Sequence, residues 1–266
     1  MKWATIYRIT VVFLVIFTII RFVFPAPNDS FGSPTWAIIL FLASALAIFG
    51  CCLKIGTNGL KVFEEIKPNV ILFGLCIAIA IGFCWCGVSF WRDLVAKSVS
   101  KDLEKQYMFM IPAAILAVLT FIISGFSHLT GENKFKKAQF LVFGPVIYFV
   151  ISIVIFLALS VNPDAYLIIS QGSLALFFVY YSQIFVTCVK KVNIIRRLLF
   201  FAVISFVSTV AGRLVLVFRG DTTGAGVNLA SNFTYILVGI YAILFVVMLS
   251  NGDGLKRDFK LEITKK

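Results

Sequence analysis

Four polar side chains in the C-terminal half of the chain are the best candidates for ligand chemistry. Gln171, Arg213, Asn232 and Tyr235 lie in three consecutive apolar segments, and helical geometry brings them to similar depth near one end of those segments. Arginine offers a fixed positive charge and a fork of N–H donors to an anionic group, while amides and phenols orient ligands through hydrogen bonds. The pattern predicts an outward-facing pocket that binds a small solute or a lipid headgroup.

A second interpretation of these residues stays open. Arg213 lies only about a turn and a half from the end of its segment, so its long side chain can reach the headgroup region of a membrane. The neighbouring serine, threonine and asparagine side chains can hydrogen-bond between helices, which stabilises membrane proteins by about 0.6 kcal/mol per bond without any ligand. In that case the polar side chains serve packing and anchoring only.

Acidic side chains are confined to the polar links between the apolar segments. Proton-coupled transporters and pumps use a carboxylate or a histidine at membrane depth, because some group there must change its charge. Because the acidic residues lie in the links, the apolar segments lack the carboxylate pair of an intramembrane aspartyl protease and the carboxylates of a metal site. The acidic residues are Asp29, Glu64, Glu65, Asp93, Asp102, Glu104, Glu132, Asp164, Asp221, Asp253, Asp258 and Glu262.

Histidine chemistry is limited to one residue, His128, at the end of an apolar segment. A single imidazole cannot build a histidine-rich metal site, and its neighbour Ser127 diverges from it by about 100° on a helix, which excludes a nucleophile and base pair. We expect His128 to lie at the membrane interface. Since the sequence holds no P-loop, dinucleotide fingerprint, HExxH or GxSxG, we expect no enzymatic activity, no catalytic residue, no metal and no cofactor.

The segments that hold these residues have the composition of membrane helices. Of the 266 residues, 61% are hydrophobic and 14% charged, whereas soluble domains have about 45–50% and 25%. Apolar runs of about 20 residues match the hydrocarbon core of a bilayer, where backbone groups must be paired within each helix. We predict an all-α integral membrane protein, a bundle of about eight transmembrane helices at 4–24, 35–53, 68–91, 108–127, 139–160, 166–189, 198–218 and 229–249.

Basic residues predict the orientation of this bundle. Much of the net charge of +12 comes from lysine and arginine in the second, fourth and sixth links and in the C-terminal tail, whereas links 25–34 and 161–165 have none. Because short cytoplasmic loops are enriched in Lys and Arg, we place both termini in the cytoplasm. The basic links are expected to contact anionic lipid headgroups, and nucleic acid is not an expected partner.

One link departs from this pattern. Residues 92–107 should be outside, yet they contain Arg92, Lys97, Lys101 and Lys105. Apolar residues recur there at near-helical spacing, so we predict a short amphipathic helix lying on the outer membrane surface.

Two other patterns bear on packing. Gly74, Ala78, Gly82 and Cys86 recur at every fourth residue, a stripe of small residues that allows close helix approach and predicts a position in the middle of the bundle. A dimer face would use the same stripe, and sequence alone does not separate the two. The pair Gly144-Pro145 is expected to kink or locally open its helix.

The domain organisation predicted from these segments is simple. Residues 1–249 form one polytopic transmembrane domain, and residues 250–266 form a short basic cytoplasmic tail. A faint similarity between the two halves predicts a parallel repeat of four plus four helices, 1–127 and 139–249.

The function that fits best is binding or transport of a small solute or lipid through the polar pocket. The alternative is a non-enzymatic membrane sensor, assembly factor or subunit of a larger membrane complex, in which a membrane protein partner or a second copy covers the small-residue stripe. The richness in Phe, Ile and Lys is typical of an AT-rich bacterial genome, so the expected location is a bacterial plasma membrane.

Overall fold

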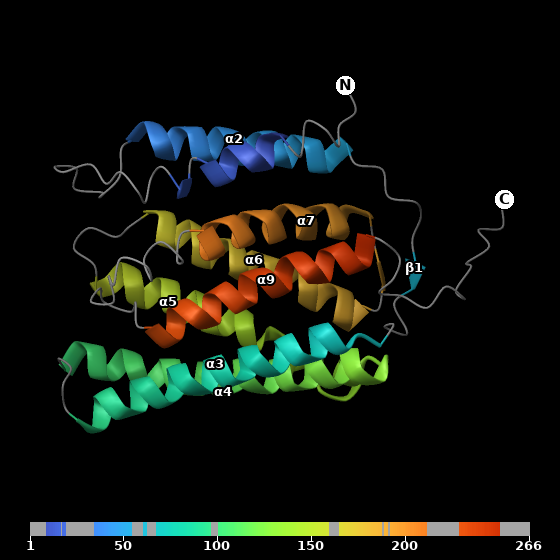
Figure 1. Ribbon diagram of the computed structural model, residues 1–266. Coiled ribbons are helices and arrows are strands. Elements are labelled where there is room, and N and C mark those ends of the chain that lie inside the picture. Colours follow the sequence, from blue (N-terminus) through green and yellow to red (C-terminus); the bar gives the residue numbers. More distant parts are fainter. Residues whose placement is uncertain are drawn as a thin grey trace.

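The protein is built from long helices that lie side by side (Figure 1). The computed structural model describes residues 9–16, 18–19, 35–54, 61–62, 68–96, 101–159, 165–187, 189–190, 192–211 and 229–250. In chain order, the elements are α2 (Thr35–Lys54), β1 (Lys61–Val62), α3 (Val70–Val95), α4 (Lys101–Thr130), the 3₁₀ helices η1 (Lys134–Lys137) and η2 (Gln139–Phe143), α5 (Gly144–Leu159), α6 (Ala165–Thr187), β2 (Val189–Lys190), α7 (Val192–Phe206), the π-helix η3 (Val207–Ala211) and α9 (Leu229–Ser250). Residues 9–16 and 18–19 are also helical.

Five of these helices are long and apolar enough to cross a membrane. They comprise Val70–Val95, Glu104–Thr130, Gln139–Ala158, Ile168–Thr187 and Ala230–Leu249, and α2 adds the shorter apolar stretch Ile39–Gly50. The chain is therefore a multi-pass helical membrane protein, as predicted. The number of eight spans and their orientation stay predictions, as does the four-plus-four repeat. Residues 251–266, the predicted tail, lie outside the described residues.

Six helices close into a ring. Each member of the series α3, α4, α5, α6, α7 and α9 packs against the next, and α9 packs back against α3. Helix α2 lies outside this ring against α7, at the top of Figure 1, and the hairpin of α3 and α4 lies at the bottom. The small contact region of α2 contains Phe41 and Ile48, which pack with Val203 and Ile204 of α7.

The stripe of small residues on α3 does not place this helix in the middle of the bundle. Ile71, Ile81 and Val88 are 64–74% exposed, so one face of α3 points outward toward lipid. The prediction was wrong because only half of the stripe is covered. A methyl group added at Gly82 would lie 2.5 Å from Thr234 Oγ1 of α9, whereas one added at Gly74 would meet nothing within 4 Å.

The amphipathic helix predicted for 92–107 is also absent from the described part of that link. Helix α3 continues to Val95 and α4 begins at Lys101, so the apolar residues at helical spacing belong to the ends of two membrane helices. Residues 97–100 lie outside the described residues. The spacing was read correctly as helical, but helices that extend beyond the hydrocarbon core have the same period as a separate surface helix.

Three basic links meet at one end of the bundle. Strands β1 and β2 pair antiparallel, with Lys61 opposite Lys190, and so join the link after α2 to the link after α6. Nearby, the Asn133 side-chain amide donates to the Phe185 carbonyl at 2.9 Å, which fastens the link after α4 to the end of α6. We name this the strand end. Its lysine content is what the sequence predicts for a shared side, and which side of a membrane it faces stays a prediction.

Helix α5 starts at a close approach to α4. The pair Gly144-Pro145 was predicted to kink a helix. Instead, it begins helix α5 directly after the 3₁₀ helix η2. Proline suits the first turn of a helix, where its missing N–H has no partner to lose. A methyl group on Gly144 would collide with the Leu116 carbonyl of α4, and the Thr120 hydroxyl donates to the Leu141 carbonyl just before it. Glycine is therefore required by the contact between backbones.

Gly144→Ala should lower the thermal unfolding midpoint of the detergent-solubilised protein, because the methyl group pushes α5 away from the α4 backbone at a cost of about 1–3 kcal/mol. The matched control is Gly172→Ala on α6, where an added methyl group meets nothing within 4 Å. We expect the control to keep or raise the midpoint, since alanine favours a helix over glycine by about 1 kcal/mol. Equal midpoints for the two variants would contradict this account of the contact.

Candidate functional site

Polar side chains of α6, α7 and α9 are buried near the end of the bundle opposite the strand end. Gln171 is 5% exposed, Asn232 0% and Tyr235 2%, although five of the helices carry large apolar residues on their outer faces. Arg213, the fourth residue of the predicted pocket, lies outside the described residues. The three described members thus lie inside the bundle, and binding of a ligand by them stays a prediction.

The side of this region formed by α6 and α7 is held by hydroxyl groups. Ser205 Oγ of α7 donates to Ser173 Oγ of α6 at 3.1 Å, and Ser173 in turn donates to the Ser170 carbonyl at 2.9 Å. The Thr209 hydroxyl donates to the Ser205 carbonyl within the same helix. The bond between Ser205 and Ser173 fastens α6 to α7 just before the α-helix changes into the π-helix η3. Single π-helical turns of this kind are frequent at functional sites.

Gly239 of α9 allows the close contact with this π-helix. A methyl group there would collide with Thr209 Oγ1 and approach Val210 Cγ2 to 3.2 Å. Gly239 therefore packs directly against Thr209 and Val210 of η3.

On α6, two buried polar atoms of the region have no hydrogen-bond partner among the described residues. They are Gln171 Oε1 and Ser170 Oγ, both fully covered. A buried acceptor without a donor costs roughly 1–3 kcal/mol, and in a membrane no bulk water is near to replace the donor. Such an atom in a native protein calls for an explanation, and a bound water or ligand is one.

Tyr235 points across the ring instead of toward α7. Its hydroxyl lies 3.2 Å from Ser152 Oγ of α5, and its ring centroid lies 5.3 Å from that of Phe149. The preceding residue, Thr234, faces Cys86 of α3, with 3.6 Å between oxygen and sulfur. The predicted residues therefore extend over two faces of the interior, one toward the π-helix and one toward α5.

A second polar cluster, which the sequence did not predict, lies nearer the strand end. Ser124 Oγ is 2.6 Å from the Tyr181 hydroxyl and 3.1 Å from the Tyr241 hydroxyl, and Tyr241 donates to Tyr181 at 3.0 Å. His128 Nε2 is 3.0 Å from the same Tyr241 oxygen. The four side chains come from α4, α6 and α9, and we call them the histidine cluster.

His128 was expected at the membrane interface; its depth in the membrane stays a prediction, and the structure shows that the side chain is buried inside the bundle. Its side chain is 0% exposed, because Tyr241 and Phe245 of α9 close over the ring. The link after α4 folds back as well, and the Lys134 backbone amide donates to Ser127 Oγ at 3.2 Å. His128 and Ser127 have separate partners, as the helix geometry predicted. A pattern that would have indicated the cluster is the four-residue spacing of Ser124 and His128, which puts two polar groups on one face of α4.

Counting hydrogens assigns the imidazole proton in the histidine cluster. The single hydroxyl hydrogen of Tyr241 is directed to Tyr181, so the Tyr241 oxygen must accept from the His128 side. His128 Nε2 therefore carries the hydrogen, and Nδ1 keeps its lone pair. Nδ1 is buried and has no partner among the described residues. Cys76 of α3 also donates to Ser124 Oγ of the cluster at 3.7 Å, and Nδ1 of His128 is the acceptor left over.

Four phenylalanine side chains separate the two polar regions. Phe83, Phe121, Phe178 and Phe149 come from α3, α4, α6 and α5, and each contributes one corner of a closed circuit. Their centroids are 5.7 Å apart from Phe83 to Phe121, 5.7 Å from Phe121 to Phe178, 6.1 Å from Phe178 to Phe149 and 6.3 Å from Phe149 to Phe83. All four are at most 1% exposed. We call them the phenylalanine layer, and it closes the axis of the ring.

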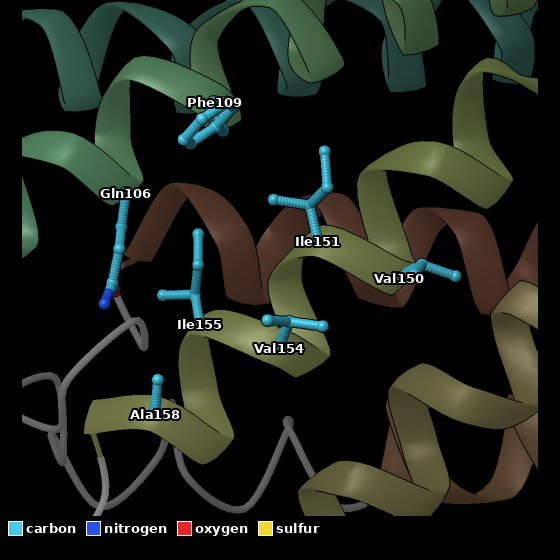
Figure 2. Close-up of a pocket in the computed structure, with 7 residues that line it drawn as sticks. All are labelled: Gln106, Phe109, Val150, Ile151, Val154, Ile155 and Ala158. Atoms are coloured by element: carbon cyan, nitrogen blue, oxygen red, sulfur yellow. The ribbon is translucent and has the colours of Figure 1, made fainter.

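A cavity lies elsewhere, on the outer side of the ring between α4 and α5 (Figure 2). Its volume is about 310 Å³, and its lining consists of Gln106, Phe109, Val150, Ile151, Val154, Ile155 and Ala158. None of the described members of the predicted pocket lines it.

No known family model matches this chain, and no curated protein or solved structure is significantly similar to it. Its function must therefore be argued from the chemistry of its own side chains.

The histidine cluster yields a stability test. Tyr241→Phe removes the hydroxyl that His128, Ser124 and Tyr181 share, so the unfolding free energy should fall by about 2–3 kcal/mol. The matched control is Tyr180→Phe, because the Tyr180 hydroxyl of the same helix as Tyr181 has only a long contact with Arg197 Nη1, at 3.4 Å, among the described residues. The control should change the unfolding free energy by less than about 0.5 kcal/mol. Thermal unfolding in detergent measures both, and a control that is as unstable as Tyr241→Phe would contradict the assignment.

Proposed function

We propose that this protein binds and passes a small polar solute with N–H or O–H donor groups, using the buried polar region of α6, the π-helix η3 and α9. The observation that carries the proposal is the carbonyl oxygen of Gln171, which is buried at membrane depth without a donor. A solute that donates to this oxygen would recover the free energy that its burial costs. The adjacent orphan hydroxyl of Ser170 supplies a second polar contact.

The surrounding structure supports a binding site more than a packing contact. Ordinary packing hydroxyls in this region already donate to carbonyls of their own helices, as Ser208 does to Ile204 at 2.7 Å. The acceptor Oε1 of Gln171 has no comparable local partner. The backbone N–H groups around a side chain in the middle of a helix already donate to backbone carbonyls. The π-helix alongside it also leaves the regular hydrogen-bond ladder, which eases local rearrangement.

We propose that no carboxylate couples passage of the solute to an ion. Among the described residues no Asp, Glu, Lys or Arg side chain is buried, so the interior offers no carboxylate that could take up a proton or sodium ion. Passage requires the phenylalanine layer to open, since it closes the axis between the two polar regions. Arg213, one residue beyond Gly212 after η3, is proposed to hold an anionic group of the same solute. No catalytic residue is part of this proposal.

The membrane arrangement that accompanies this function is the predicted one. We propose eight spans with both termini in the cytoplasm of a bacterial plasma membrane, a transmembrane domain of residues 1–249 and a cytoplasmic tail. The five long apolar helices and the gathering of basic links at the strand end support this arrangement. Those links are proposed to contact anionic lipid headgroups.

A role as sensor, assembly factor or complex subunit has one observation in its favour. It predicts an uncovered small-residue face, and Gly74 on α3 has open space in front of it. Gly82 on the same stripe is covered by Thr234, so the uncovered part is short. The proposal of binding and passage is supported by more observations, namely the two buried polar atoms of Gln171 and Ser170 and the π-helix η3 beside them.

Ligand binding is tested by thermal stabilisation. A panel of amino acids, polyols, urea derivatives and short carboxylates is screened with the detergent-solubilised protein, because a ligand that binds only the folded state raises its midpoint. Gln171→Leu should lower the affinity for the stabilising compound about tenfold, since one hydrogen bond to a buried acceptor is lost. The matched control is Gln183→Leu, an exposed glutamine on the same helix.

The variant without ligand provides the internal check. Gln171→Leu should unfold at the same midpoint as the natural protein or higher, because leucine removes an unsatisfied buried acceptor. A compound that stabilises Gln171→Leu as strongly as the natural chain would remove Gln171 from the site. The same outcome with Arg213→Ala would remove Arg213.

The orientation is tested with single cysteines at Asn162 and Lys190 in a variant that lacks the six natural cysteines. A membrane-impermeant maleimide added to intact cells should label position 162 and not 190, because one link is proposed outside and the other inside. Labelling of both positions from the same side would overturn the proposed orientation.

A further inference from the structure

Polar side chains of α7 change the helix that they contact where α7 becomes the π-helix η3, between its neighbours α6 and α9 (Figure 1). Ser205 Oγ donates to Ser173 Oγ of α6 at 3.1 Å, so Ser205 faces α6. Thr209, four residues later, lies against α9, because a methyl group on Gly239 would collide with its Oγ1. In a continuous α-helix, residues four apart lie on nearly the same face. The two side chains contact different helices because the π-helix begins between them.

An α-helical form of residues 207–211 would point Thr209 elsewhere. Four residues of an α-helix complete slightly more than one full turn, about 400°. A π-helix bonds each carbonyl to the fifth residue and has more residues per turn, so four of its residues complete less than one turn. The α form would therefore rotate Thr209 away from Gly239 and toward the side of α7 that faces α6.

Helix α6 has an unsatisfied hydroxyl at the depth of Thr209. Ser170 precedes Ser173 by three residues, so it lies on the same face of α6, one turn further from the strand end. Its Oγ is buried and has no hydrogen-bond partner among the described residues. Because α6 ends and α7 begins at the strand end, Thr209 is likewise one turn further from that end than Ser205. The α form would thus bring the Thr209 hydroxyl to the side of α7 that faces Ser170.

The carbonyls just before η3 have side-chain donors for either form. The Thr209 hydroxyl donates to the Ser205 carbonyl, and Ser208 Oγ donates to the Ile204 carbonyl at 2.7 Å. Ser208 Oγ also lies 3.4 Å from the Ser205 carbonyl, so it can donate there when Thr209 turns away. In hydrocarbon no water replaces a lost donor, and this exchange keeps the carbonyl satisfied during the change.

We propose that η3 switches between the π form and an α form, and that the α form closes the solute site by placing the Thr209 hydroxyl against Ser170. In the π form the Ser170 hydroxyl is available to the solute, and in the α form Thr209 takes the place of the solute. This inference rests on the proposed function, since Ser170 is a contact of the proposed solute. A solute that uses Ser170 favours the π form, because it binds only that form.

The switch is tested by disulfide formation in the full-length variant that lacks the six natural cysteines. The pair Ser170→Cys with Thr209→Cys reports the α form, because cysteines form a disulfide only when their backbones approach closely. The matched control pair, Ser173→Cys with Ser205→Cys, joins the same helices just before η3. Isolated membranes are oxidised with copper phenanthroline, and the remaining thiols are counted by maleimide polyethylene glycol on a denaturing gel. We expect the control pair to react about tenfold faster, since the test pair reacts only from the less populated form.

Gly239→Ala should shift the balance between the two forms. Its methyl group would occupy the place of Thr209 Oγ1 in the π form, so the disulfide between positions 170 and 209 should form about tenfold faster. The disulfide between positions 173 and 205 should form at an unchanged rate. The matched control is Gly74→Ala on α3, where a methyl group meets nothing within 4 Å and neither rate should change.

Several results would overturn the switch. Equal rates for the two pairs without Gly239→Ala would show that Thr209 already faces Ser170 in the π form. An unchanged rate at positions 170 and 209 in Gly239→Ala would show that the methyl group does not drive an α form. Loss of the disulfide between positions 173 and 205 in that variant would show that α7 moves as a whole.

The solute is tested separately with the same two pairs. A compound that stabilises the natural chain in the thermal screen should slow the disulfide between positions 170 and 209 and leave the control pair unchanged. An unchanged rate for both pairs would separate η3 from the solute site and overturn its regulation of that site. A screen without any stabilising compound would remove the proposed function, whereas the rates without ligand would still decide whether η3 switches.

Discussion

In hydrocarbon, a polar group finds a partner within the protein or does without one, and this constraint shapes the whole interior of the bundle. Ser124, Tyr181 and Tyr241 meet it by bonding to one another, so that three helices distant in sequence share one set of hydroxyl groups. Many other hydroxyls, such as those of Thr234 and Ser208, donate to carbonyls four residues earlier in their own helices. Because nearly all such groups are satisfied, the few that are not, such as Gln171 Oε1, carry information about ligands.

The same constraint explains why the interior is aromatic. Tyrosine combines a large apolar ring with one hydroxyl, so it fills the centre of a six-helix ring and still reaches a partner. Tyr241 shows both roles, since its ring lies 5.7 Å from Phe121 of the phenylalanine layer and its hydroxyl bonds to the histidine cluster. Smaller aliphatic side chains would leave the axis of such a ring open, and voids of that kind are unfavourable. Two requirements thus explain the layers of the interior: aromatic rings must fill the space between the six helices, and each polar group must lie near a hydrogen-bond partner.

Features that depend on local pattern were predictable from sequence, and features that depend on distant partners were not. Length and hydropathy sufficed for the long helices. The burial of His128 was not predicted because the groups that cover it, Tyr241 and Phe245, lie more than 110 residues further along the chain. The outward face of α3 was missed for the same reason, since a stripe of small residues does not say how much of it a neighbour covers. The predicted pocket residue Arg213 lies outside the described residues.

Closure of the ring by α9 has a consequence for biosynthesis. Helix α9 is the last described element of the chain, yet its Thr234 covers Gly82 and Cys86 on α3, which is made far earlier. Strand β1 likewise waits for β2, which follows α6. A ribosome-bound intermediate therefore holds an open arc of helices whose inner tyrosines and serines face lipid or one another. Until α9 has entered the membrane, Ser124 and Cys86 lack the hydroxyl partners that this helix supplies.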